Sequence, residues 1–266
     1  MVTWVIQSEY SQGWDNWNDK IVKRCEETGH DCIEIKIVPF ERSVVGGDPV
    51  ITDTPVVAYG STAIDTVVAR NDWKPALWRV DGVIESNSRD ALGDLYLNDD
   101  LVVCSVHDGA KIASERGWDQ FFIKPNTDSK EFAGTITDTG RYGYLLESVF
   151  NEDWIDDDFD VVVSSIKPLG LEWRLVVVDG KVADYSIYRK SMRVDPERSI
   201  RQEVLDLADQ AIKRHNPAPV FVIDIGEYNG MLKVIEYNGF NSSGLYHCDI
   251  NNIVDAVNDY VVREYG

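Results

Sequence analysis

The sequence predicts an α/β protein whose rear part is an α+β lobe built on a sheet of its own. In the first hundred residues, short apolar runs alternate with helix-compatible stretches, as in a parallel sheet with crossover helices. In the last third, β-branched runs are joined by Asp179-Gly180 and Asn229-Gly230, which are typical hairpin turns. With 266 residues, 44% of them hydrophobic, the chain can bury a core in one or two lobes.

The front part is expected to contain three strands and two helices. The expected strands and helices are Val2–Ile6, Trp14–Glu27, a strand with Ile33, Ile35 and Ile37 on one face, Pro55–Tyr59, and Ala63–Ala69. Between the last two, Gly60-Ser61-Thr62 would follow the carboxyl end of a strand, where open α/β sheets place their ligands. An ordinary helix N-cap explains the same three residues.

The middle part, from about Asn98 to Asp160, contains a strand, Gln120–Pro125, that carries Lys124 just before a proline. The last third is expected to form several strands and two helices. The strands are Asp160–Ser165, Glu172–Val178, Lys181–Tyr188, Val220–Ile225 and Leu232–Tyr237. Asp195-Pro196 is expected to open one helix, as N-cap and first helical residue, and Asp249 to cap the closing helix.

Charge and composition limit the classes of partner. The 46 acidic against 26 basic residues give a formal charge of −20, which repels nucleic-acid backbones and anionic membranes. A local basic pocket can still hold a nucleotide, because short-range contacts outweigh a screened distant field. No apolar run reaches membrane-spanning length, the start resembles a strand rather than a signal peptide, and the four cysteines form no CxxC pair. These features favour a reduced, cytoplasmic chain.

Two acids lie inside β-branched runs near the end of the chain, Asp224 and Glu236. Buried acids need a partner charge or a cation, and Glu236 shares a strand face with Asn238. Asp224 joins that face if the turn is a three-residue loop, 228–230, whereas a two-residue turn would put the two acids on opposite faces. Two carboxylates and an amide oxygen suit one or two Mg²⁺ ions that also bind nucleotide phosphates. The alternative is a pair of acids on a solvated sheet face.

The order of these motifs resembles the ATP-grasp superfamily. The resemblance rests on Lys124-Pro125, Glu172-x-Arg174, Asp224 and Glu236-Tyr237-Asn238, and it is strongest from Phe122 onward. It is closest to the phage-associated clade named for two arginines and a lysine. It implies an ATP-grasp fold with a pre-ATP-grasp α/β lobe over residues 1–98, a small lid over 99–160 and a sheet-based lobe over 161–266.

The resemblance also implies a role for each site residue. Lys124 and Lys130 would bind the ATP phosphates, the backbone of Ser165, Ile166 and Lys167 would bind adenine, Glu172 would bind the ribose, Arg174 and Arg189 would meet the phosphates as catalytic residues, and Asp224, Glu236 and Asn238 would hold Mg²⁺. Many ATP-grasp ligases carry an arginine where this chain has Val222, so Arg174, Arg189 or Arg193 would have to supply that charge. The alternatives are an exposed Lys124, a surface ion pair between Glu172 and Arg174, and a solvated basic edge around Arg189.

The implied activity is an ATP- and Mg²⁺-dependent ligase that joins a carboxylate to an amine through an acyl phosphate. Its substrates would be small-molecule or peptide carboxylates and amines, without bulk nucleic acid or membrane as partners. The protein would be cytoplasmic or, if phage-encoded, would act in the host cytoplasm. Two alternatives remain open: an ATP-grasp phosphotransferase with water or a hydroxyl as acceptor, and a non-catalytic nucleotide-binding module.

Overall fold

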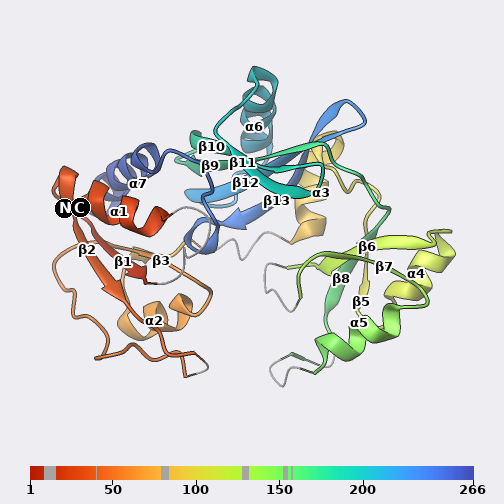
Figure 1. Ribbon diagram of the computed structural model, residues 1–266, viewed down its shortest axis with the longest axis horizontal. Helices are drawn as coiled ribbons and strands as arrows, with labels where there is room; N and C mark the ends of the chain where they lie inside the picture. The colour runs from red at the N-terminus through yellow and green to blue at the C-terminus, as the bar shows by residue number, and fades with distance from the viewer. Residues whose placement is uncertain (9–15, 40, 79–83, 128–131, 152–154, 157) are drawn as a thin grey trace.

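The computed structural model describes residues 1–8, 16–39, 41–78, 84–127, 132–151, 155–156 and 158–266. Within these residues the chain forms three sheets, each with its own helices. Figure 1 shows the rear sheet at the top, with the N-terminal lobe and the lid below it on opposite sides. The predicted α/β class with a rear α+β lobe is confirmed.

The N-terminal lobe is a parallel sheet in the order β2-β1-β3-β4. Its elements are β1 (Thr3–Gln7), α1 (Trp17–Thr28), β2 (Asp31–Ile35), β3 (Val56–Tyr59), α2 (Ile64–Asn71) and β4 (Pro75–Ala76). Helix α1 ends at Gly29, whose φ of 74° lets its N–H return to the carbonyls of Cys25 and Glu26. The apolar run predicted for the first strand is almost completely buried in β1.

The lid is an antiparallel sheet in the order β5-β8-β6-β7, with a small core of its own. It is preceded by α3 (Glu85–Leu92) and the short 3₁₀ helix η1 (Gly93–Leu95). The lid elements are β5 (Val102–Ser105), α4 (Gly109–Glu115), β6 (Gln120–Pro125), β7 (Thr135–Asp138), α5 (Tyr142–Val149) and β8 (Asp160–Ser164). The sequence-based boundary between residues 160 and 161 falls inside β8, which bonds to two lid strands.

The rear lobe is a five-stranded antiparallel sheet in the order β11-β10-β9-β12-β13. Its elements are β9 (Leu171–Val178), β10 (Lys181–Lys190), β11 (Arg193–Glu197), α6 (Gln202–Arg214), β12 (Val220–Tyr228), β13 (Met231–Gly239), the 3₁₀ helix η2 (Phe240–Ser242) and α7 (Ile250–Tyr265). Asp249 caps α7, as predicted, by accepting from the N–H of Asn251. In the described part of the chain, no helix combines the length and apolar character needed to cross a bilayer.

The helix start predicted at Asp195-Pro196 is wrong. Both residues lie in β11, which pairs with β10, and α6 begins only at Gln202. The open edge of β10 offers hydrogen bonds that outweigh the local helix-start signal, and an edge strand tolerates a proline because only one side of it is bonded. The apolar residues on the inner face of α6 are buried, including Val204 and Leu207.

The N-terminal lobe is fastened to the rear lobe through Asn241. Its buried amide donates to the carbonyls of Ala58 at 2.6 Å and Ala76 at 3.1 Å, and its oxygen accepts from the N–H of Trp78 at 2.9 Å. Beside it, Phe240 packs against the rings of Trp4 and Trp78. The two lobes therefore meet at a polar anchor that lies next to an aromatic cluster.

We expect Asn241→Ala to lower the free energy of unfolding by about 1–3 kcal/mol, because it leaves buried backbone groups without a partner. The measurement is urea unfolding followed by circular dichroism. The control is Asn251→Ala, whose side chain is exposed and should matter little. Equal stability of the Asn241 variant and wild type would contradict the anchor.

Candidate functional site

A β-bulge aligns the two acids of the β12–β13 hairpin. The turn has two residues, Asn229 and Gly230, with φ of 51° and 75°, so the predicted three-residue loop is wrong. The register shifts between the pairs Ile225↔Val234 and Asp224↔Glu236, which leaves Ile235 as an extra residue on β13. This extra residue shifts the alternation of side chains along β13 by one position. Asp224 therefore lies directly opposite Glu236 on the same sheet face, despite the two-residue turn.

Arg174 forms a two-pronged ion pair with Asp224. Its Nε and Nη2 lie 2.9 and 2.7 Å from the two carboxylate oxygens, and Nη1 donates to the carbonyl of Gly244 at 3.2 Å. The rings of Tyr188 and Tyr246 flank the guanidinium, with centroids 5.1 and 5.4 Å from its carbon. Burial by itself would lower the pKa of Arg174, but the facing carboxylate outweighs burial and raises it. The pair is therefore charged, buried and held from several strands.

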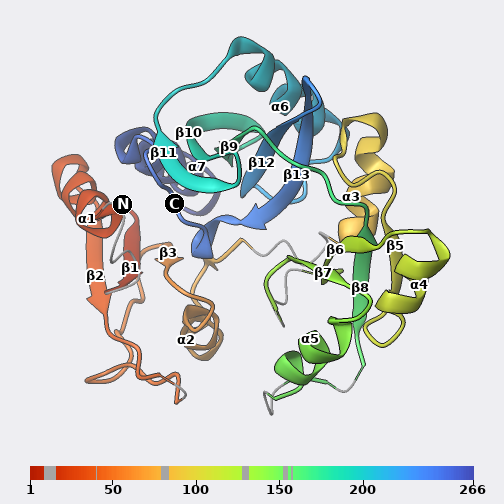
Figure 2. The same ribbon diagram turned by 45° about the vertical axis from the view of Figure 1, so that its right-hand side comes forward.

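Lys124 reaches from the lid to the rear sheet and binds two acids at once. Its Nζ lies 2.8 Å from Glu85 Oε1 and 2.7 Å from Glu236 Oε2. Burial alone would raise the pKa of Glu236, yet Lys124 and Asn238 lower it to about 2. Burial raises the pKa of Glu85, whose second oxygen accepts from the hydroxyl of Tyr96. Figure 2 shows α3, which begins with Glu85, between the rear sheet and the lid.

Asn238 completes an oxygen-rich group with the two acids. Its amide nitrogen lies 3.3 Å from Asp224 Oδ2 and 3.2 Å from Glu236 Oε1, so turning the amide over would present its oxygen to a cation between them. Two carboxylates and an amide oxygen form a hard donor set that fits Mg²⁺ with phosphate oxygens as further ligands. Across the described residues, no group of three or more His, Cys, Asp or Glu side chains is placed to hold a metal ion.

Glu172 lies on the same face as Arg174, two residues before it on β9. Its Oε2 accepts from the hydroxyl of Tyr188 at 2.8 Å and lies 4.0 Å from Arg189 Nη1. Burial raises the pKa of this carboxyl. The surface ion pair considered between Glu172 and Arg174 does not form, because Arg174 bonds to Asp224 instead.

Ser165, Ile166 and Lys167 follow β8 and lead into the rear lobe. The carboxylate of Asp100 accepts from the Ser165 N–H at 3.2 Å and from Lys167 Nζ at 2.5 Å. Lys167 Nζ also lies 3.1 Å from Ser165 Oγ. Asp100 therefore fixes the shape of this connection and occupies one of its backbone donors.

The structure brings most of the predicted site residues to one face of the rear sheet and to the lid strand beside it. Lys130 lies outside the described residues. Glu85, Asp100 and Tyr188 were missed by the sequence interpretation. The only signal at Glu85 is an acid in the first turn of α3, which is too common to indicate a site.

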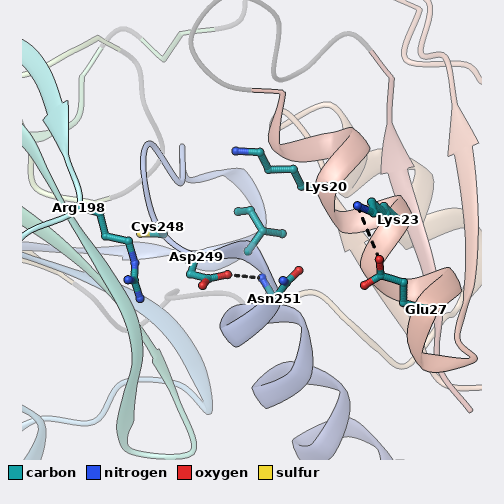
Figure 3. Close-up of a pocket in the computed structure, with 8 residues that line it drawn as sticks. Lys20, Lys23, Glu27, Arg198, Cys248, Asp249 and Asn251 are labelled. Carbon is teal, nitrogen blue, oxygen red and sulfur yellow. Dashed lines mark hydrogen bonds and ion pairs between the residues drawn. The ribbon is translucent and has the colours of Figure 1, made fainter.

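A separate pocket of about 350 Å³ lies between α1 and the start of α7 (Figure 3). It is lined by Lys20, Lys23, Glu27, Arg198, Cys248, Asp249, Ile250 and Asn251. None of these residues belongs to the acid cluster around Asp224 and Glu236, so this pocket is distinct from the predicted nucleotide site.

Known proteins support the arrangement at the level of family and fold. The family model for the ATP-grasp domain, family 2 of the clade named for two arginines and a lysine, matches residues 103–256, which is more than half of the chain. No curated protein sequence matches the chain.

Solved structures with the same fold span nearly the whole chain. D-alanine–D-alanine ligase from Bacillus anthracis, complexed with ATP, has a TM-score of 0.65 at 14% identity, covering 99% of this chain and 97% of that chain. A RimK domain ATP-grasp protein from Sphaerobacter thermophilus has a TM-score of 0.63 at 12% identity, covering 98% and 99%. The ATP-grasp ligase PsnB, complexed with a minimal precursor, has a TM-score of 0.56 at 14% identity, covering 97% and 98%. At these identities the likeness shows the fold alone.

The Arg174–Asp224 pair leads to a prediction about stability. We expect Asp224→Asn to lower the free energy of unfolding by about 3–5 kcal/mol, because it leaves the buried guanidinium of Arg174 without its counter-charge. The double variant, with Asp224→Asn and Arg174→Met together, should lose much less free energy of unfolding than the sum of the losses in the two single variants. Urea unfolding of wild type, both single variants and the double variant measures the coupling. The exposed pair Lys213–Asp209 on α6 is the control and should couple by only about 0.3–0.5 kcal/mol. Additive effects at Arg174 and Asp224 would contradict the pairing.

Proposed function

We propose, since the chain belongs to the ATP-grasp domain family 2 of the two-arginine, one-lysine clade, that it uses ATP to activate a carboxylate and joins it to an amine. The observation that carries the proposal is the charged cluster at the junction of lid and rear sheet. There Lys124 and Arg174 face Glu236 and Asp224, with Asn238 between the two acids. Cations for phosphate and oxygen ligands for a divalent ion are thus adjacent.

The protein's own cations lie against these acids in the structure. Lys124 Nζ lies 2.7 Å from Glu236 Oε2, and Arg174 Nη2 lies 2.7 Å from Asp224 Oδ2. We infer that the phosphates of ATP attract Lys124 and Arg174, which leaves Asp224, Glu236 and Asn238 to hold Mg²⁺. When bound, Mg²⁺ supplies positive charge to the phosphate oxygens at the transferring group.

The remaining nucleotide contacts would come from the connection after β8 and from β9. Ile166 and Lys167 would offer backbone groups to adenine, while Asp100 holds the Ser165 N–H. Glu172, buried beside Tyr188, would accept hydrogen bonds from the ribose hydroxyls. Lys130 keeps its predicted role on the phosphates.

The reaction needs no nucleophile from the protein. A substrate carboxylate oxygen attacks the γ-phosphorus, ADP leaves, and the resulting acyl phosphate is attacked by an amine that expels inorganic phosphate. The nitrogen loses its proton as the amide forms. The side chains position the reactants and stabilise developing negative charge.

Arg174 is the best placed of the three arginines considered as substitutes at the Val222 position. Val222 is fully buried and carries no charge, but Arg174 meets Asp224 two residues further along β12. Arg189 is half exposed and lies near Glu172, where it could reach the outer phosphates. Arg193 lies on the edge strand β11, further from the acids.

A product screen tests the proposed reaction. We expect repeated turnover to ADP and phosphate only when a carboxylate and an amine are both present with Mg²⁺, and mass spectrometry to detect the amide. Glu236→Ala should abolish ADP formation, because the transferring phosphate loses charge compensation. The exposed acid Glu203 on α6 provides the control, and Glu203→Ala should keep full activity. Repeated ADP formation in the absence of any carboxylate would instead indicate a phosphotransferase, and nucleotide binding with no turnover would indicate a binding module.

Nucleotide binding should also raise thermal stability. ADP with Mg²⁺ at about 100 times its Kd should add roughly 2.7 kcal/mol, read as a rise in Tm. Lys124→Met should lose most of this shift, because the ammonium contacts the phosphates. Lys36→Met, in the N-terminal lobe, should keep it. Equal shifts in wild type and the Lys124 variant would show that the lysine does not contact the nucleotide.

A further inference from the structure

We propose that Glu85 is a positioning residue that holds Lys124 in place both before and after nucleotide binding, an inference that rests on the proposed ATP site. Lys124 then exchanges only one contact, that with Glu236, for a phosphate oxygen. Three features of the described structure carry this inference. Glu85 is buried, its surroundings are bonded to both the lid and the rear sheet, and Glu236 differs from it in exposure and in neighbours.

Glu85 is a deeply buried acid with both oxygens occupied. Its side chain is only 5% exposed, and it accepts from Lys124 Nζ at 2.8 Å and from the hydroxyl of Tyr96. A buried carboxylate without a counter-charge is strongly unfavourable. The ammonium of Lys124 is the counter-charge, so the two groups stabilise each other.

The backbone around Glu85 is tied to the lid and to the rear sheet. The Glu85 N–H donates to the carbonyl of Asn126 at 2.8 Å, just beyond the end of β6, the lid strand that carries Lys124. Tyr96 forms a bridge with Val234 of β13, and the Leu97 N–H donates to the Val234 carbonyl at 2.8 Å. Glu85 is therefore held at the junction, beside the lid strand that carries Lys124.

Glu236 differs from Glu85 in exposure and in neighbours. Its side chain is 28% exposed, and it faces Asp224 and Asn238 in the oxygen group that fits a cation. Glu236 therefore has another partner to take when nucleotide and Mg²⁺ arrive. In the described structure Glu85 contacts neither Asp224 nor Asn238, so Lys124 remains its counter-charge.

If Glu85 positions Lys124, removing the Glu85 charge should change nucleotide affinity in the opposite direction to the one that simple electrostatics predicts. Removing a negative charge near bound phosphates should tighten their binding if charge alone matters. If Glu85 positions Lys124, Glu85→Gln should weaken binding, because Lys124 then turns to Glu236 as its charged partner. Hydrogen bonds to charged groups are strong enough to make this loss about tenfold in Kd.

The experiment is titration calorimetry of Mg²⁺ and ADP with wild type, Glu85→Gln, Lys124→Gln and the double variant. We expect about tenfold weaker binding for Glu85→Gln, and no further loss when the same change is made in the Lys124→Gln background. Glu115→Gln, which removes an exposed lid charge, should bind as wild type does.

Equal or tighter binding by a folded Glu85→Gln variant would overturn the positioning role, as would an equal loss in the Lys124→Gln background. If Glu85→Gln does not fold, Glu85→Asp replaces it. That variant keeps the charge but shortens the side chain, so it should also weaken binding, and unchanged affinity would overturn the role. Wild type that fails to bind Mg²⁺ and ADP would reject the proposed function as well, whereas normal binding without ligation would reject the ligase alone.

Discussion

Charge pairing on one face of the rear sheet is the constraint on which the rest of the structure depends. Asp224 is completely buried opposite Glu236, with Glu172 on the same sheet face and Glu85 on the far side of Lys124, in a chain of formal charge −20. Acids in such surroundings are tolerated only if cations or hydrogen bonds compensate them. Arg174 and Lys124 supply the charge, and Tyr96 and Tyr188 supply hydroxyl groups.

These pairs also hold the parts of the molecule together. Lys124 comes from the lid, Glu85 from the helix beside it and Glu236 from the edge strand of the rear sheet, so one ammonium joins three segments. Arg174 links β9 and β12 to Gly244, while Asn241 in η2, three residues earlier, anchors the N-terminal lobe. The lobe arrangement and the candidate site therefore rest on the same contacts.

This coupling gives the proposed reaction a physical basis. In that reaction, phosphates would compete for the cations that link the parts, and a divalent ion would compete for the acids that those cations release. The acids would then exchange one positive partner for another. Binding of nucleotide at this junction would then change how the lid is held, because Lys124 lies on a lid strand.

The sequence by itself determined the α/β class and the family motifs, and it predicted most of the residues that the structure brings together at the candidate site. It did so because Lys124-Pro125, Glu172-x-Arg174 and Glu236-x-Asn238 depend on local spacing along single strands. Only the tertiary structure decided that Asp224 faces Glu236, since the extra residue Ile235 is a property of strand pairing and not of the turn. It also placed Asp195-Pro196 in an edge strand, because β10 offered an open edge. Glu85 was invisible to sequence reasoning, because its partner Lys124 lies 39 residues away and is adjacent only after the chain has folded.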